Sequence, residues 1–192
     1  MSCNTDIRTE LTKAAQAHGA TASASFDPRE IELRSEVRDM CAADRCGRYG
    51  KNWMCPPGVA SLDYWNRELE RYDAGILLQV TVWLEDPFDY ETMLAGEKRL
   101  KSVFRKLKKD FPPNGGELLF LQAGSCDVCE TCTFPDLPCR FPELALPSLE
   151  AIGIVVTDLC RSAGLPYYYG DGSLTYSGAI LVRQPVDKKV QK

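Results

Sequence analysis

Four cysteines within fourteen residues carry the strongest chemical signal in the sequence. They are Cys126, Cys129, Cys132 and Cys139, in the order C-x2-C-x2-C-x6-C. Bacterial ferredoxins use the C-x2-C-x2-C step to hold a [4Fe–4S] cluster, and a fourth cysteine comes from further along the chain or from elsewhere. The spacing therefore predicts a metal site in this segment, with an iron–sulfur cluster as its first interpretation.

Zinc is the alternative metal, and it would make the protein a zinc-stabilised interaction module. Structural zinc usually takes two separated pairs of ligands, often with histidine among them. The only histidine is His18, which lies far from these cysteines in the last turn of a helical pattern and suits the helix dipole there. A third cysteine so close to a C-x2-C pair is crowded for a tetrahedral ion. Ligand type and spacing therefore favour the cluster over zinc.

A second cysteine group lies earlier in the chain, in a segment rich in glycine and proline. Cys41, Cys46 and Cys55 follow the order C-x4-C-x8-C, and Pro56-Pro57-Gly58 comes directly after them. Three cysteines in a short polar loop predict a second ligand group, because isolated buried thiols rarely gather in this way.

This second group is one ligand short of a fully bound [4Fe–4S] cluster. The candidates for the fourth ligand are Cys160, Cys3, another residue type and water, although Cys160 falls on the inner face of a predicted helix and is expected to be a core thiol. One iron left open would act as a Lewis acid toward a substrate, whereas a fully ligated cluster only transfers electrons. Ligands that cross between the two groups are a further alternative.

Composition limits the classes of function. The formal net charge is −4, which argues against a nucleic-acid-binding protein. No segment approaches the ~20 apolar residues needed to span a bilayer, and the first residues contain no apolar run typical of a signal peptide. We therefore expect a cytoplasmic protein with no membrane partner. Nine cysteines in a reducing compartment indicate metal ligands or buried thiols sooner than disulfides.

The rest of the chain predicts a single α/β domain over residues 1–192, with a small mixed or largely parallel sheet flanked by helices. Both cysteine-rich loops follow predicted strands, so we expect them at one edge of the sheet if the first and third strands run the same way. Helices are predicted at residues 6–18, 61–72, 90–110 and 147–163, and strands at 20–26, 76–84, 117–123 and 174–182.

The predicted helix at residues 90–110 has one strongly basic side. We interpret it as a solvated face, with a docking surface for an acidic redox partner as the functional alternative. Its basic residues are Lys98, Arg99, Lys101, Arg105, Lys106, Lys108 and Lys109.

The pattern as a whole resembles a family of uncharacterised prokaryotic proteins known as predicted metal-binding proteins. The resemblance covers residues 41–182 and implies metal binding without implying a particular reaction. Such proteins occur often in anaerobes, which is consistent with iron–sulfur clusters. The matching elements are Cys41, Cys46, Tyr49-Gly50, Trp53 and Cys55-Pro56-Pro57, then Cys126, Cys129, Cys132 and Cys139-Arg140-Phe141-Pro142, then Pro147-Ser148-Leu149-Glu150-Ala151-x-Gly153.

Three functions remain open at this point. The first is a redox protein that carries one or two [4Fe–4S] clusters and passes electrons to a partner protein. The second is an enzyme with an open-iron cluster at Cys41, Cys46 and Cys55, which would desulfurate or dehydrate a small substrate. For that enzyme we expect a pocket lined by Tyr49, Lys51, Trp53 or Arg140. The third is the zinc-stabilised module.

Overall fold

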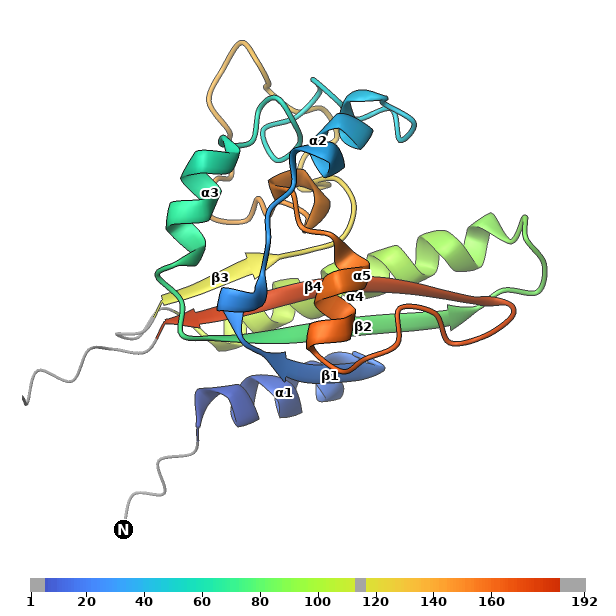
Figure 1. The fold of residues 1–192 in the computed structure, drawn as a ribbon. Coiled ribbons are helices and arrows are strands. Elements are labelled where there is room, and N and C mark those ends of the chain that lie inside the picture. Colours follow the sequence, from blue (N-terminus) through green and yellow to red (C-terminus); the bar gives the residue numbers. More distant parts are fainter. Residues whose placement is uncertain (1–5, 113–116, 184–192) are drawn as a thin grey trace, which may run out of the picture.

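A four-stranded sheet lies at the centre of the fold (Figure 1). The computed structural model describes residues 6–112 and 117–183. The strands have the spatial order β1-β2-β4-β3, and each strand is antiparallel to its neighbours. They are β1 (Ala22–Phe26), β2 (Ala74–Trp83), β3 (Glu117–Leu121) and β4 (Ser173–Arg183).

The α/β class is confirmed, but the expected mixed or largely parallel sheet is wrong. Alternating strands and helices suggested parallel pairs, because a helix between two strands usually returns the chain to a parallel neighbour. Helix α4 (Tyr90–Asp110) does return the chain, so that β3 runs in the same direction as β2. However, β4 from the end of the described chain inserts between β2 and β3 and pairs antiparallel with both.

The sheet is buried on both faces, as the continuous apolar sequence of β2 predicted. Ile76 and Leu78 pack with α1 (Ile7–His18) and α4 on one face, whereas Leu77 packs on the opposite face. That second face is covered by α3 (Leu62–Leu69), by α5 (Val156–Ser162) and by η2 (Glu150–Ile152), a single 3-10 turn. Successive side chains of a strand point to opposite faces, so one apolar run serves both layers.

The predicted helix at residues 147–163 is replaced by two shorter elements. The chain forms η2, turns at Gly153 with φ +99°, and then forms α5. An added Cβ at Gly153 would lie 2.7 Å from Leu62 and 3.1 Å from the carbonyl oxygen of Arg34. The positive φ and this close approach explain why one continuous helix does not form.

Helix α2 (Ser35–Ala42) was not expected, because its sequence has only weak apolar periodicity and none of its residues is buried. It carries Cys41 in its last turn. After β1 the chain forms a 3-10 turn, η1 (Pro28–Glu30), and then reaches α2 by a short extended segment. In this segment Leu33 bridges Ile154, and the backbone N–H of Arg34 donates to the carbonyl oxygen of Gly153 (2.8 Å).

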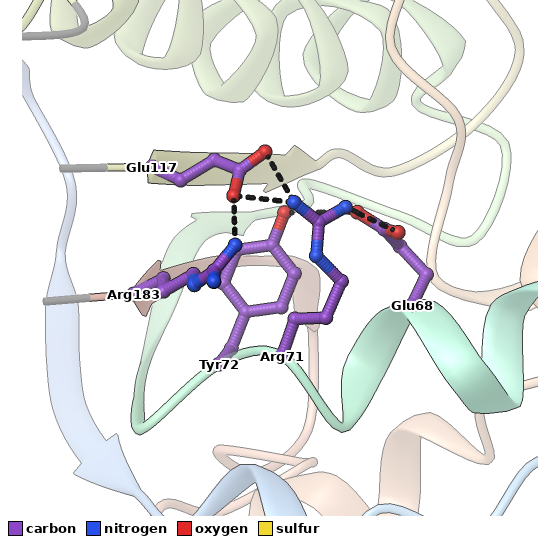
Figure 2. Close-up of polar contacts among 5 residues, drawn as sticks. All are labelled: Glu68, Arg71, Tyr72, Glu117 and Arg183. Atoms are coloured by element: carbon purple, nitrogen blue, oxygen red, sulfur yellow. Dashed lines mark hydrogen bonds and ion pairs between the residues drawn. The ribbon is translucent and has the colours of Figure 1, made fainter. Parts of the chain in front are cut away.

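A polar cluster joins α3 to the beginning of β3 (Figure 2). The Glu117 carboxylate accepts from Arg71 (2.7 Å) and Arg183 (3.0 Å), and Arg71 also pairs with Glu68 (2.8 Å). Tyr72 donates its hydroxyl to Glu68, and burial followed by the charge of Glu68 raises the pKa of this phenol. The cluster fixes the end of β3 that lies away from the cysteines.

No helix within residues 6–112 and 117–183 has the length and apolar character needed to cross a membrane.

Candidate metal centre

The second cysteine loop, residues 123–146, begins and ends at the same place. Gln122 directly follows β3, and its backbone N–H donates to the carbonyl oxygen of Pro147 (2.9 Å). Its carbonyl oxygen accepts from the N–H of Leu149 (3.1 Å), and its buried side-chain amide donates to the carbonyl oxygen of Leu146 (3.1 Å). One residue therefore closes the base of the loop from which four cysteines project.

All four cysteines of this loop line one small cavity of about 20 Å³. Cys126, Cys129, Cys132 and Cys139 are each half-buried. This volume is close to that of a single water molecule, so a cluster would have to widen the loop. The residues between the cysteines, including Asp127, Glu130 and Thr131, are largely exposed at the surface.

The first cysteine loop, residues 41–58, surrounds a larger cavity of about 450 Å³. Cys41, Cys46 and Cys55 all line it. Asp44 turns the chain with φ +47°, and its carboxylate accepts from the backbone N–H of Tyr49 (2.8 Å). The other lining residues come from several elements and are Arg48, Tyr49, Pro56, Glu97, Gly124, Ser125, Ser148, Glu150 and Ala151.

The two cysteine groups meet although β1 and β3 run in opposite directions. Trp53 of the first loop donates its indole N–H to the carbonyl oxygen of Leu137 in the second loop (3.1 Å), and its ring packs edge-on against Phe134 (4.9 Å between centroids). A Cβ at Gly58 would lie 2.8 Å from the Phe134 ring, so the loops approach closely there. The two loops are therefore in contact at Trp53, although the first and third strands do not run the same way as the sequence analysis had supposed.

Burial raises the pKa of the Cys41, Cys55 and Cys126 thiols. The negative charge of a Cys126 thiolate, from the other loop, would raise the pKa of Cys55 further. Neutral thiols in the metal-free protein must release protons before they can bind a metal, so metal binding here is coupled to proton release.

A buried lysine beneath the second loop was missed by the sequence analysis. Lys101 was counted with the basic side of α4, but its side chain is 4% exposed. Its ammonium group pairs with Glu97 (2.6 Å), donates to the carbonyl oxygen of Ser125 (2.7 Å) and lies 3.9 Å from Asp127. Arg105, one turn further along α4, also pairs with Asp127 (3.2 Å). Two cations of α4 therefore hold the residues on either side of Cys126.

Gly124 allows this contact between the loop and α4. Its φ is +70°, and an added Cβ would lie 2.6 Å from the Glu97 carboxylate. The Lys101 interactions depend on a loop that approaches α4 closely, and helical periodicity in the sequence gives no signal for such an approach.

The other residues considered in the sequence analysis are dispersed. Cys160 is 1% exposed in the core, where the Gln79 amide donates to its sulfur (3.4 Å), so its interpretation as a core thiol is confirmed. His18 pairs with Asp110 (2.6 Å) between α1 and α4. Cys3 lies outside the described residues. Arg140 donates to the carbonyl oxygen of Thr131 (3.0 Å) at the surface.

Of the four residues expected to line an enzyme pocket, only Tyr49 lines the first cavity. Lys51 donates to the carbonyl oxygen of Gly47 (2.8 Å) and is exposed. Within residues 6–112 and 117–183, no three His, Cys, Asp or Glu side chains are arranged to hold a single metal ion.

A further cavity of about 780 Å³ adjoins the second loop at Cys139. It lies between α3, β3 and residues 135–147, and its wall is mainly apolar. Trp65 and Phe120 contribute to this wall, and Lys108 is its one basic residue.

Three comparisons with known proteins gave one family match, one similar solved structure and no curated relative. No curated protein matches this chain. The chain is similar to one solved structure, an epoxyqueuosine reductase from Streptococcus thermophilus, with 14% identity and a TM-score of 0.43. That similarity covers 97% of this chain and 49% of the other, so the present chain spans about half its length. A family model matches residues 24–182, and the chain therefore belongs to DUF2284, a family of predicted metal-binding proteins.

Proposed function

We propose that this protein is an iron–sulfur protein that carries two [4Fe–4S] clusters and transfers electrons. Cys126, Cys129, Cys132 and Cys139 would hold one cluster, and Cys41, Cys46 and Cys55 would hold the other. The observation that carries this proposal is that seven thiols line two cavities, whose loops are separated by 70 residues in sequence but contact each other at Trp53.

The donor set suits iron and sulfide. All seven groups are thiols, the ligands typical of iron–sulfur clusters, and the second group keeps ferredoxin spacing. A bound cluster supplies one-electron oxidation and reduction. The protein's own residues would then govern the surroundings: Val128, Phe141 and Ala145 exclude water from the second site, and Lys101 and Arg105 place positive charge next to it.

The basic side of α4 fits a docking surface for an acidic redox protein. Arg105 contacts the second cysteine loop through Asp127, so this helix passes directly beside the proposed cluster. An acidic partner attracted to α4 would therefore approach the cluster closely. The exposed basic residues of α4 are Lys98, Arg99, Arg105, Lys106 and Lys109.

A second candidate function is an enzyme that uses an open iron at the first site. The cavity of about 450 Å³ falls within the usual size range of small-molecule pockets. Arg48 and Tyr49 line it beside the three thiols, and together they provide a cation and a hydroxyl for a small polar substrate.

Metal and sulfide analysis of protein purified without oxygen tests the proposal. Two clusters correspond to about eight irons and as many sulfides per chain, and one cluster to about four. Electron paramagnetic resonance after reduction should then show reduced clusters. Protein that contains zinc without iron would overturn both candidate functions and leave the zinc-stabilised module.

A further inference from the structure

The first cysteine group presents three thiols, whereas a [4Fe–4S] cluster has four corners. Within the described chain, the remaining thiol of Cys160 is buried in the core and lines neither cysteine cavity. The wall of the first cavity contains two carboxylates, those of Glu97 and Glu150. Each is a possible oxygen donor for iron, and their surroundings distinguish them.

Glu97 is already engaged. Its carboxylate forms an ion pair of 2.6 Å with Lys101, whose side chain is almost fully buried. Removing Glu97 from this pair would leave a buried ammonium group with one partner fewer, at a considerable cost in free energy. Glu97 therefore belongs to the structural network under the second loop.

Glu150 has no such cationic partner among the described residues. Its side chain is half-buried and lines the cavity beside the three thiols, where the Ser148 hydroxyl and its own backbone N–H stabilise the carboxylate. A half-buried carboxylate without a compensating cation costs free energy in the metal-free protein. The group is therefore well placed to gain from a cation inside the cavity.

The position of Glu150 is set by rigid elements. It is the first residue of η2, whose backbone follows directly from the segment paired with Gln122. The Ser148 hydroxyl also accepts from the N–H of Ala151 (3.1 Å), which orients it toward the Glu150 carboxylate. η2 packs against α2, and the charge of Glu150 acts on the Cys41 thiol at the end of that helix.

We propose that the Glu150 carboxylate completes the ligand set of Cys41, Cys46 and Cys55 by binding the fourth iron of the cluster. This inference rests on the proposed function. A carboxylate is a harder donor than a thiolate and binds iron of a cluster less firmly. The iron next to Glu150 is then the exchangeable corner, and it is where a substrate or water would enter.

Selective labelling of that corner tests the inference. Mild oxidation of the full-length, cluster-loaded protein removes its most weakly held iron, and refilling with a Mössbauer-active isotope labels that position alone. We expect Glu150→Gln to change the Mössbauer parameters of the labelled iron and to speed its loss by about tenfold or more. Glu36→Gln, which removes an exposed carboxylate from α2, should leave both properties unchanged.

The outcomes separate the inference from the function on which it rests. The role of Glu150 alone is overturned by two results together. The wild-type protein contains about eight irons, and Glu150→Gln has the same iron spectrum and the same rate of iron loss as the wild type. Wild-type protein that has no iron at the first site overturns the proposed function of that site, whatever Glu150 does. Because glutamine matches glutamate in shape, circular dichroism of the metal-free variant should show a native fold, and a misfolded variant would contradict the view that the carboxylate is costly there.

Discussion

The two cysteine groups differ in where their surroundings come from. The second loop places four cysteines in fourteen residues, and one buried residue, Gln122, closes its base. The first group places its cysteines on the end of α2 and on two later turns, and its cavity is completed by residues of α4, the second loop and η2. One proposed ligand set is therefore local in sequence, and the cavity of the other is completed by distant elements.

This difference has consequences for the behaviour of the two sites. A local set of four thiols can bind metal before the rest of the chain is folded, as small metal-binding modules do. A set whose walls come from distant elements requires those elements to be in place. The following predictions test whether the two sites behave independently in this way.

The largest expected effect is the loss of one cluster on removal of a ligand. Cys132→Ser should lower the iron content from about eight to about four per chain, because three thiolates of the second loop no longer hold all four irons. Iron and sulfide analysis of protein purified without oxygen measures this. Complete loss of iron would show that the first site depends on the second.

Cys160→Ala is the matched control, since it removes a thiol that lies in the core. Its iron content should equal that of the unchanged protein, while the free energy of unfolding should fall by about 1 kcal/mol. Loss of iron in Cys160→Ala would indicate that Cys160 is a ligand after all.

The next effect concerns the buried cation of the second loop. Lys101→Met keeps the length of the side chain but leaves Glu97 and Asp127 without their shared partner. Both carboxylates are partly exposed, so we expect the free energy of unfolding of the metal-free protein to fall by about 2 kcal/mol, less than for a fully buried pair. Denaturant titration followed by circular dichroism measures the change.

The same variant should lose iron from the second site faster than from the first, because Lys101 holds the backbone before Cys126. Lys106→Met provides the control on the exposed side of α4 and should change unfolding by less than about 0.5 kcal/mol. Equal effects of the two substitutions would contradict the structural role of Lys101.

A smaller effect is expected at the contact between the loops. Trp53→Phe keeps a ring next to Phe134 but removes the N–H that donates to Leu137. The loss of one hydrogen bond should lower the free energy of unfolding by about 1 kcal/mol. Trp83→Phe, at an exposed position of β2, should have no measurable effect in the same denaturant titration. If Trp53→Phe and Trp83→Phe have the same free energy of unfolding, the two loops are not joined through the Trp53 hydrogen bond.

The smallest effect is expected at the opposite end of β3, in the cluster of Figure 2. Glu117→Gln removes two ion pairs that are open to solvent, and such pairs contribute little to stability. The urea midpoint should fall slightly at low salt, and the difference should vanish at high salt because mobile ions screen the charges. Iron content should be unchanged, and a loss of iron would connect this cluster to the metal sites.

Several features could be predicted from short stretches of sequence. The cysteine spacing identified both groups, and the apolar run of β2 indicated a strand buried on both faces. The predicted helix at residues 90–110 has the bounds of α4. Each of these depends on residues that are close together in the chain, where periodicity and spacing are direct consequences of backbone geometry.

Other features were decided by contacts between distant residues. The sheet is antiparallel because β4 lies between β2 and β3. These partners are about 60 to 100 residues away from β4 along the chain, so local sequence patterns do not reveal the pairing. Lys101 became buried only because Gly124 lets the second loop approach α4. Glu150 lines the cavity of the first group from η2, a single 3-10 turn that ends at Gly153 instead of continuing as the expected helix.

The sequence by itself supplied the seven thiols that we propose as metal ligands, since thiols at these spacings have few other uses in a chain of this composition. The tertiary structure alone decided which charged side chains stand beside those thiols. The physical reason is that burial and ion pairing depend on the packing of the whole chain, whereas the type and spacing of the cysteines are fixed by the order of residues in the sequence.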